Sequence, residues 1–435
     1  MRPFFQFFSS LRLTVTLLAL AMVLIFLATL DQGQWGVYEV QHRYFETFLA
    51  VWHYPEQWPG ADYFDRIPVP LPGGFLLGGL LVVNLLCAHF RHYRASLDRA
   101  GITLIHGGLL LLIVSGFATA YFQQEYYMWL NVGGRSDFIQ SFRDVDLVLI
   151  DHTDPKDDLV VSIPSTRLQP GETISDPALP FTLRTVDYYP NSQFYLRSQN
   201  PGSPALNADQ GVAQNRDIGV APKSYDYVND TENVASGIIS IDSPSGHLGQ
   251  WLVSTLFTGA MVPPFLAKSL PQTFTVNGHT WEIALRPRRE YLNFWLYLDK
   301  FIHEKYPGTD VPRRFESEAR LVNPDTHENR HLLIYMNHPL RYSGLTFYQA
   351  SFSPNDSASM LQVVRNPGWI LPYLAVLVVG LGLVFHFLLS LIRHLREESK
   401  LSAPAARTPD AAPSSPPSFP HSKLEVPEPT LPASP

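Results

Sequence analysis

The sequence predicts an integral membrane protein with four transmembrane helices and a large β-rich extracytoplasmic domain between the third and fourth helices. Three observations predict this fold class. Four apolar runs are long enough to cross a bilayer, since about 20 helical residues span the hydrocarbon core. Arginine and lysine gather at one end of these runs. The long segment before the fourth run contains stretches that alternate apolar and polar residues, which is typical of strands.

The four apolar runs occupy residues 11–30, 72–90, 101–122 and 369–392. The first run is also a candidate secretory signal peptide. However, its apolar stretch is about 20 residues long and no small-x-small cleavage site follows it, so we expect a retained membrane span.

Basic residues predict the orientation of the spans, because short loops rich in lysine and arginine stay in the cytoplasm. They lie before the first run, in the short link between the second and third, and after the fourth. We therefore expect both termini in the cytoplasm and the long polar segment outside. These residues are Arg2, Arg12, Arg91, Arg94, Arg99, Arg393, Arg396 and Lys400.

The predicted organisation has six parts. They are the N-terminus with the first helix (1–30), an extracytoplasmic loop (31–71), the second and third helices with their basic link (72–122), the β-rich domain (123–366), the fourth helix (367–393) and a cytoplasmic tail (394–435). The tail is dominated by proline, alanine and serine, so it cannot bury enough apolar surface to fold.

Local patterns predict several elements outside the membrane. Residues 37–52 have apolar and aromatic residues at helical spacing, which fits a helix on the membrane surface or one packed under the outer domain. Strands are expected at 145–150 and 181–189, and Asn277-Gly278 predicts a two-residue hairpin turn. We expect residues 197–235 to be irregular and 250–270 to hold a short helix or a surface-associated segment.

Composition excludes some classes of function. The formal net charge is −7 and the basic residues flank apolar runs, so nucleic-acid binding is not expected. Cys87 is the only cysteine. The chain therefore cannot form an internal disulfide or carry a dithiol redox pair, and any thiol chemistry belongs to a partner.

His106 and His386 lie inside apolar runs, where an unsatisfied imidazole costs free energy and usually marks a functional site. Each is seven residues from an arginine on the same side, Arg99 and Arg393. That spacing predicts equal depths of about 10 Å at about 1.5 Å per residue. Two imidazoles at one depth are candidate axial ligands of a metal or haem iron; the alternative is hydrogen bonding to a neighbouring helix.

Other histidines are weaker candidates. His89 lies two residues from Arg91 and is expected at the solvated boundary of the membrane. His42, His53 and His338 are candidate outer-side ligands, but no spacing among them defines a metal site, so we expect surface residues.

A set of motifs in fixed order gives the chain a family resemblance before its tail. They are SLRLTVTLLAL with ATLDQG in the first span, PLPGGFLLGGLLVVNLLCAHFRH in the second, RAGITLIHGGLLLL opening the third, YPGTDVPRRFESEARLVNP, and MNHPLRYSGLTFYQASF before the last span. With this topology, the chain resembles ResB-like cytochrome c biogenesis proteins, the CcsB-like subunits of System II.

The resemblance implies a subunit of a cytochrome c synthase complex in the bacterial inner membrane, which moves haem b across the bilayer for attachment to apocytochrome c. Its implied partners are a ResC/CcsA-like membrane protein and thiol-reducing thioredoxin-like proteins. His106 matches the family's span-three histidine, which is thought to bind haem together with a histidine of the partner. Gly101, Gly107 and Gly108 would let a flat porphyrin approach that helix.

Three functional classes remain open from the sequence. Haem transfer needs at least one intramembrane ligand, and His386 is either its mate within the chain or a residue of the helix packing. A scaffold for apocytochrome or thiol-reducing partners would tolerate loss of both histidines. A b-type electron carrier would need a stable bis-histidine haem. Arg341 is a candidate for a haem propionate or for an ordinary salt bridge, and no residue is identified as a catalytic nucleophile or base.

Overall fold

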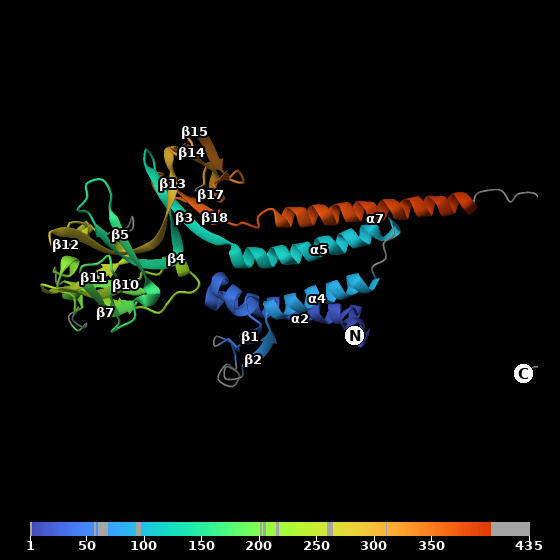
Figure 1. Cartoon of the computed structure of the whole chain (residues 1–435), viewed down its shortest axis with the longest axis horizontal. Coiled ribbons are helices and arrows are strands. Elements are labelled where there is room, and N and C mark those ends of the chain that lie inside the picture. Colours follow the sequence, from blue (N-terminus) through green and yellow to red (C-terminus); the bar gives the residue numbers. More distant parts are fainter. Residues whose placement is uncertain are drawn as a thin grey trace, which may run out of the picture.

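The computed structural model describes residues 2–55, 58–59, 68–92, 97–200, 202, 206–214, 217–258, 264–309 and 311–401. Long helices form one end of the molecule and a β-rich domain forms the other (Figure 1). The N-terminus and the far end of the last helix lie at the end away from the β-rich domain (Figure 1). The predicted tail beyond residue 401 falls outside the described residues.

Among the described residues, four helical segments are long and apolar enough to cross a membrane: Leu11–Phe45, Gly74–Arg91, Arg99–Phe122 and Leu371–Ser399. The β-rich domain lies between the third and fourth, so the predicted fold class is confirmed. The helices are α1 (Arg2–Phe8), α2 (Leu11–Val40), α4 (Gly74–His92), α5 (Leu97–Phe122) and α7 (Leu371–Leu401). Large apolar side chains on α2 and α7 stay exposed, as lipid contact requires; Phe26 and Phe387 are 63% and 66% exposed.

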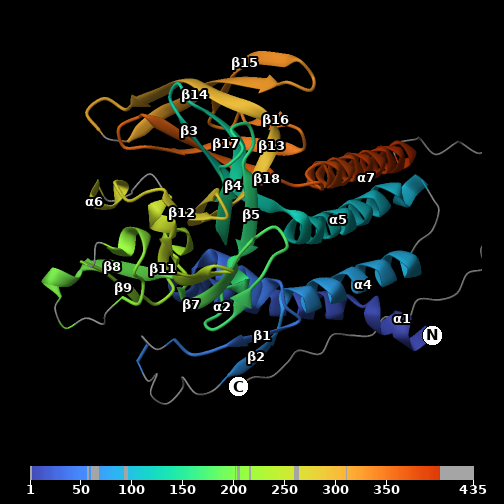
Figure 2. The same ribbon diagram turned by 60° about the vertical axis from the view of Figure 1, so that its left-hand side comes forward.

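The long helices pack as two pairs, α2 with α4 and α5 with α7 (Figures 1 and 2). Buried Asn84 of α4 joins the first pair, because its side-chain amide donates to the carbonyl oxygen of Phe8, 2.6 Å away, and accepts from the hydroxyl of Thr14 at 2.7 Å. Glycines join the second pair: Gly101 and Gly108 of α5 and Gly382 of α7 lie so close to the opposite helix that a Cβ would meet backbone atoms.

Two helix ends differ from the sequence prediction. Residues 31–40 continue α2 instead of beginning a loop, and a π-helical turn, η1 (Gln41–Phe45), extends it further. Gly36 bends α2 with φ +67° and ψ 171°, a conformation essentially restricted to glycine. A ribbon of β1 (Leu49–Trp52) and β2 (Val69–Pro72) then follows. α7 continues to Leu401, past the predicted end at 393, because charged residues extend a helix beyond the membrane without penalty.

The β-rich domain, which is the outer domain of the predicted topology, is built from antiparallel strands, as predicted. Its ten-stranded sheet contains β3 (Gln124–Asn131), β4 (Arg135–Asp151), β5 (Leu159–Pro164), β12 (Gln272–Val276), β13 (His279–Lys305), β14 (Pro312–Asn323), β15 (Glu328–Tyr335), β16 (Leu340–Tyr342), β17 (Leu345–Phe352) and β18 (Ala358–Arg365). A four-stranded sheet contains β6 (Thr173–Ile174), β7 (Thr182–Tyr189), β10 (Ser236–Ser243) and β11 (Gly246–Ser254).

The turn chemistry expected from the sequence is present. Asn277 and Gly278 both have positive φ, 52° and 83°, and connect β12 to β13 as a two-residue hairpin. The short helix expected in 250–270 is α6 (Pro264–Ala267). Residues 197–235 are less irregular than predicted, because β9 (Ile218–Pro222) pairs there with β8 (Ser192–Leu196).

Several apolar clusters fill the domain, and the long strands β4 and β13 contribute to the two largest. One core lies between the four-stranded sheet and one half of the long strands, and includes Leu147, Ile239 and Trp281. The other includes Ile139, Phe294 and Phe347. β13 changes register with β4 between Pro287 and Arg289 and again between Tyr291 and Leu296, where it passes from one core to the other.

Candidate functional site

His106 lies on the face of α5 that is turned away from α7. Gly101, Ile105 and Gly108 form the α7-facing stripe, because each lies next to atoms of α7. At about 100° per residue, His106 is about 100° from Ile105 and about 160° from Gly108 around the helix. Its own face is that of Phe117, eleven residues and about three turns further along α5.

This face of α5 looks toward α4. A Cβ on Gly78 of α4 would lie 2.9 Å from the ring of Phe117, so the two helices are in contact there. α4 and α5 run in opposite directions (Figure 1). His89 on α4 and His106 on α5 are each eleven residues from this contact. Because the helices are antiparallel, both lie toward the same end of the pair and at the same level. The two imidazoles are near enough to influence each other electrostatically.

His89 is therefore a residue that the sequence interpretation underestimated. Its closeness to Arg91 indicated a solvated boundary position, but the crossing of the two helices places it beside the strongest ligand candidate. The equal spacing of Gly78 to His89 and of His106 to Phe117 was present in the sequence. This equal spacing places the two histidines at one level only when the Gly78–Phe117 contact is known.

His386 lies at a different level and faces a different surface. Its backbone N and Cα are both 2.7 Å from the position of a Cβ on Gly101, so it is level with Gly101. Five residues, or about 7.5 Å, separate that level from His106. The expectation of equal depth is therefore wrong, because counting from flanking arginines assumed that both helices enter the membrane alike. The structure does not bring His106 and His386 face to face.

The glycines around His106 have two different roles. Gly101 and Gly108 are covered by α7, so the sequence interpretation of a glycine surface open to a porphyrin is wrong for these two positions. At Gly107, a Cβ would meet no other atom within 4 Å, so the backbone beside His106 is accessible.

The three histidines that the sequence places on the outer side do not share contacts in the structure. His42 Nδ1 lies 2.6 Å from Glu46 Oε2, and its ring packs against Tyr38. His53 is exposed. His338 is exposed and stacks on Tyr335 with ring centroids 4.7 Å apart. The described residues contain no group of three or more histidine, cysteine, aspartate or glutamate side chains arranged to hold a metal.

A second site lies where the helices meet the outer domain. A cavity of about 540 Å³ there is lined by the end of α2, η1, the end of α5, the first residues of β3 and the middle of β4. Arg143 of β4 lines it, and its guanidinium lies 3.7 Å from the ring centroid of Tyr38 while its Nε lies 2.5 Å from Asp230. This side chain thus connects α2 to the β-rich domain.

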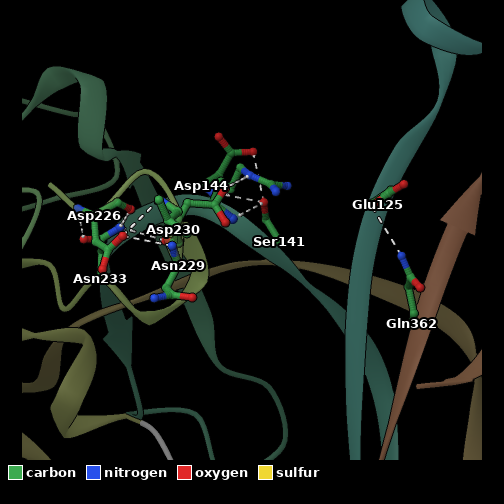
Figure 3. Close-up of polar contacts among 10 residues, drawn as sticks. Glu125, Ser141, Asp144, Asp226, Asn229, Asp230, Asn233 and Gln362 are labelled. Carbon is green, nitrogen blue, oxygen red and sulfur yellow. Dashed lines mark hydrogen bonds and ion pairs between the residues drawn. The ribbon is translucent and has the colours of Figure 1, made fainter. Parts of the chain in front are cut away.

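The loop that carries Asp230 is organised by its own polar groups (Figure 3). Asp226 accepts hydrogen bonds from the backbone N–H groups of Val228 and Asn229, and Asn233 donates to the carbonyl oxygens of Asp226 and Asp230. These bonds to the carboxylate lower the pKa of Asp226. The conformation of the loop is therefore held by its own hydrogen bonds.

The last conspicuous motif also meets the membrane segment. Arg341 of β16 lies with its guanidinium 4.2 Å from the ring centroid of Trp369, just before α7. Beside it, Asn366 donates to Thr119 Oγ1 and Gln123 Oε1 at the end of α5, and Arg365 pairs with Glu290. The motif before the last span thus positions α7 against the outer domain.

Comparison with known proteins supports the resemblance drawn from the motifs. Residues 272–365, which form β12 to β18, match the model of the ResB-like family. The chain is 33% identical over 126 residues to the cytochrome c biogenesis protein CcsB of Prochlorococcus marinus and 31% identical over 124 residues to protein NrfI of Wolinella succinogenes.

The resemblance to ResB-like proteins is confirmed. These alignments cover 29% and 28% of this chain, and 27% and 14% of the two relatives, in the same order. The ResB-like segment contains the MNHPLRYSGLTFYQASF motif, but His89, His106 and His386 lie outside it.

Proposed function

We propose that this chain handles haem as a subunit of a membrane complex that matures c-type cytochromes. The names of the ResB-like family and of the CcsB relative support the process. One observation supports the step: His106 lies within a membrane-spanning helix, and His89 lies opposite it at the same level. Polar side chains at such positions are costly unless they serve a site.

Haem in this proposal is cargo, and His106 is its first ligand. A neutral imidazole is a good axial ligand for haem iron. The fit is favoured by the open backbone at Gly107, next to His106. The second ligand comes from His89 within the chain or from a histidine of the ResC/CcsA-like partner.

His386 has a secondary place in the proposal. It lies on the α5-facing stripe of α7, level with Gly101, and so nearer the basic end of the helices than His106. A haem that enters from that end would meet His386 before His106. We therefore propose His386 as an entry ligand rather than as the mate of His106.

The proposed setting is the bacterial cytoplasmic membrane, with both termini in the cytoplasm and the β-rich domain outside. The basic residues at one end of all four spans support this orientation. In this setting the partners are the ResC/CcsA-like protein, apocytochrome c and thioredoxin-like reductants. Thioether formation is shared with the complex.

Visible absorption of the purified chain tests the proposal, with and without the ResC/CcsA-like partner. We expect the haem absorption band to disappear in His106→Ala and to weaken or shift in His89→Ala when His89 is the second ligand. The matched control is His338→Ala, which removes an exposed histidine outside the membrane. Haem content should be unchanged in this control.

The opposite result is equally clear. If His106→Ala and His386→Ala keep native haem content and native cytochrome c maturation, haem handling is refuted and the chain acts as a scaffold. A stable, reversibly reducible haem in the isolated chain, without any effect of the variants on maturation, would instead favour the b-type electron carrier.

A further inference from the structure

A second cavity, of about 560 Å³, lies within the β-rich domain, and none of the membrane histidines lines it. It is formed by β13, by the residues that follow β11 and by the segment from α6 to β12. Much of its lining is apolar, including Val160, Phe257 and Leu270. Cavities of this size suit small molecules.

Two arginines of β13 line this cavity, Arg286 and Arg289. Residues three apart in a regular strand point to opposite faces. The pairing of β13 with β4 shifts register between Pro287 and Arg289, so the strand is not regularly paired between the two arginines, and both side chains line one cavity.

Neither guanidinium has an acidic partner among the described residues. Arg286 is only 7% exposed, and the Nε–H groups of Arg286 and Arg289 are buried without a hydrogen-bond acceptor in that part of the chain. The hydroxyl of Tyr291 accepts a long hydrogen bond from Arg286 Nη2, at 3.4 Å. Buried charged donors without acceptors are unfavourable, which indicates that an acceptor is missing.

The surrounding charges do not neutralise the pair. Burial, and then the positive charge of Arg286, lower the pKa of Arg289, and the strongest opposing influences come from tyrosines rather than carboxylates. Asp146 is the cross-strand neighbour of Arg286, but it is engaged by Arg288 and by the hydroxyl of Ser162.

Two carboxylates do line the cavity, and both are held by one histidine. His152 lies 2.8 Å from Asp158 and 2.9 Å from Glu282. These groups leave the cavity with one acidic side and one unneutralised basic side. A monoanion suits this arrangement better than a dianion, because the acidic side repels a dianion more strongly.

We propose that this cavity binds a small molecule that has one carboxylate on an apolar body, with the carboxylate between Arg286 and Arg289. The guanidinium fork matches a carboxylate in shape and donates charge-assisted hydrogen bonds. The apolar walls receive the body of the ligand. This site does not depend on the haem-handling proposal.

Isothermal titration calorimetry with 1-naphthylacetate tests the site in the full chain reconstituted in lipid nanodiscs. We expect saturable binding, and at least tenfold weaker binding of the uncharged 1-naphthylacetamide. Arg289→Met should weaken naphthylacetate binding at least tenfold. The control is Arg320→Met, because Arg320 lies over the ring of Tyr297, as Arg289 lies over that of Phe138, but belongs to another part of the sheet.

Several results would overturn the proposal. They are equal binding of the acid and the amide to the native chain, unchanged affinity in a folded Arg289→Met variant, and tighter binding of 1-naphthyl phosphate than of naphthylacetate. The first and third comparisons use the native chain, so they decide the question even when a variant does not fold.

Competition experiments distinguish the sources of the carboxylate. A lipid-derived acid is represented by decanoate with decanol as its uncharged analogue, and a porphyrin propionate by protoporphyrin IX with its dimethyl ester. Displacement of naphthylacetate by decanoate alone supports a lipid-derived ligand, and displacement by protoporphyrin IX alone supports a porphyrin. Displacement by neither acid overturns the assignment. Only the porphyrin result bears on the proposed function.

Discussion

Replacing Gly101 by alanine tests the packing that separates His386 from His106. A Cβ at position 101 would lie 2.7 Å from the backbone N and Cα of His386, whereas ordinary van der Waals contact needs 3.4–4 Å. Helices α5 and α7 must therefore separate by about 0.7–1.3 Å at this point, because the opposing atoms belong to backbone and cannot rotate away. Overpacking of this kind costs about 1–3 kcal/mol.

The matched control is Gly107→Ala in the same helix. Position 107 has open space around it, so a Cβ meets nothing within 4 Å. Alanine there should stabilise the helix by about 0.5–1 kcal/mol relative to glycine. The two variants are chemically identical and differ only in what they face, so their unfolding free energies should differ by about 1.5–4 kcal/mol.

Unfolding of the full chain by SDS in mixed micelles, followed by tryptophan fluorescence, measures this difference. We expect Gly101→Ala to unfold at a lower SDS fraction than the native chain and Gly107→Ala at an equal or higher one. Equal midpoints for the two variants would refute the close approach of α5 and α7. They would also remove the reason for placing His386 away from His106.

Three further predictions concern the outer domain and its junction with the membrane helices. Arg143→Met should destabilise the junction by about 1–3 kcal/mol, because Asp230 is 15% exposed and loses its partner. The control is Arg43→Met, which removes a more exposed pair and should cost under about 1 kcal/mol. Chemical unfolding of the two variants measures the difference. Gly36→Ala should lower the free energy of unfolding by at least about 1 kcal/mol, since φ is +67° and a Cβ would lie 2.0 Å from the carbonyl oxygen of Tyr227. The control in the same assay is Gly33→Ala, because position 33 has open space around it. Equal stability of the two variants would contradict the strained bend. Hydrogen bonds that His152 donates to the carboxylates of Glu282 and Asp158 raise its pKa above 6.5. The stabilising effect of His152 is therefore full below pH 6.5 and is lost as pH rises through the raised pKa. The difference in Tm between the native chain and His152→Gln should shrink over that range, and a difference that grows with pH would contradict this sign.

The architecture was predictable because its signals are local. Each membrane span is a continuous apolar run, and each tight hairpin is marked by its turn residues, such as Asn277-Gly278. The ends of α2 and α7 were less predictable. A helix can leave the membrane and continue in water, so hydropathy marks the boundary of the bilayer rather than the last helical residue.

The candidate site was predictable only in part. His106 and His386 stand out in the sequence because each is a polar residue within an apolar run. His89 does not, because its position near Arg91 also fits a solvated boundary. Arg286 and Arg289 were not predicted at all, since three-residue spacing in a regular strand separates side chains and the register shift with β4 that lies between them depends on tertiary pairing.

The sequence by itself determined four membrane spans, one β-rich outer domain, a ResB-like resemblance and two histidines within the spans. Tertiary structure decided which surfaces those histidines face: His106 lies toward His89 of α4, and His386 lies against Gly101. The physical reason is that hydropathy depends on each residue's own transfer free energy. The rotation of a helix and its level in the bundle depend instead on helix packing, in which a small residue of one helix accommodates a side chain of another.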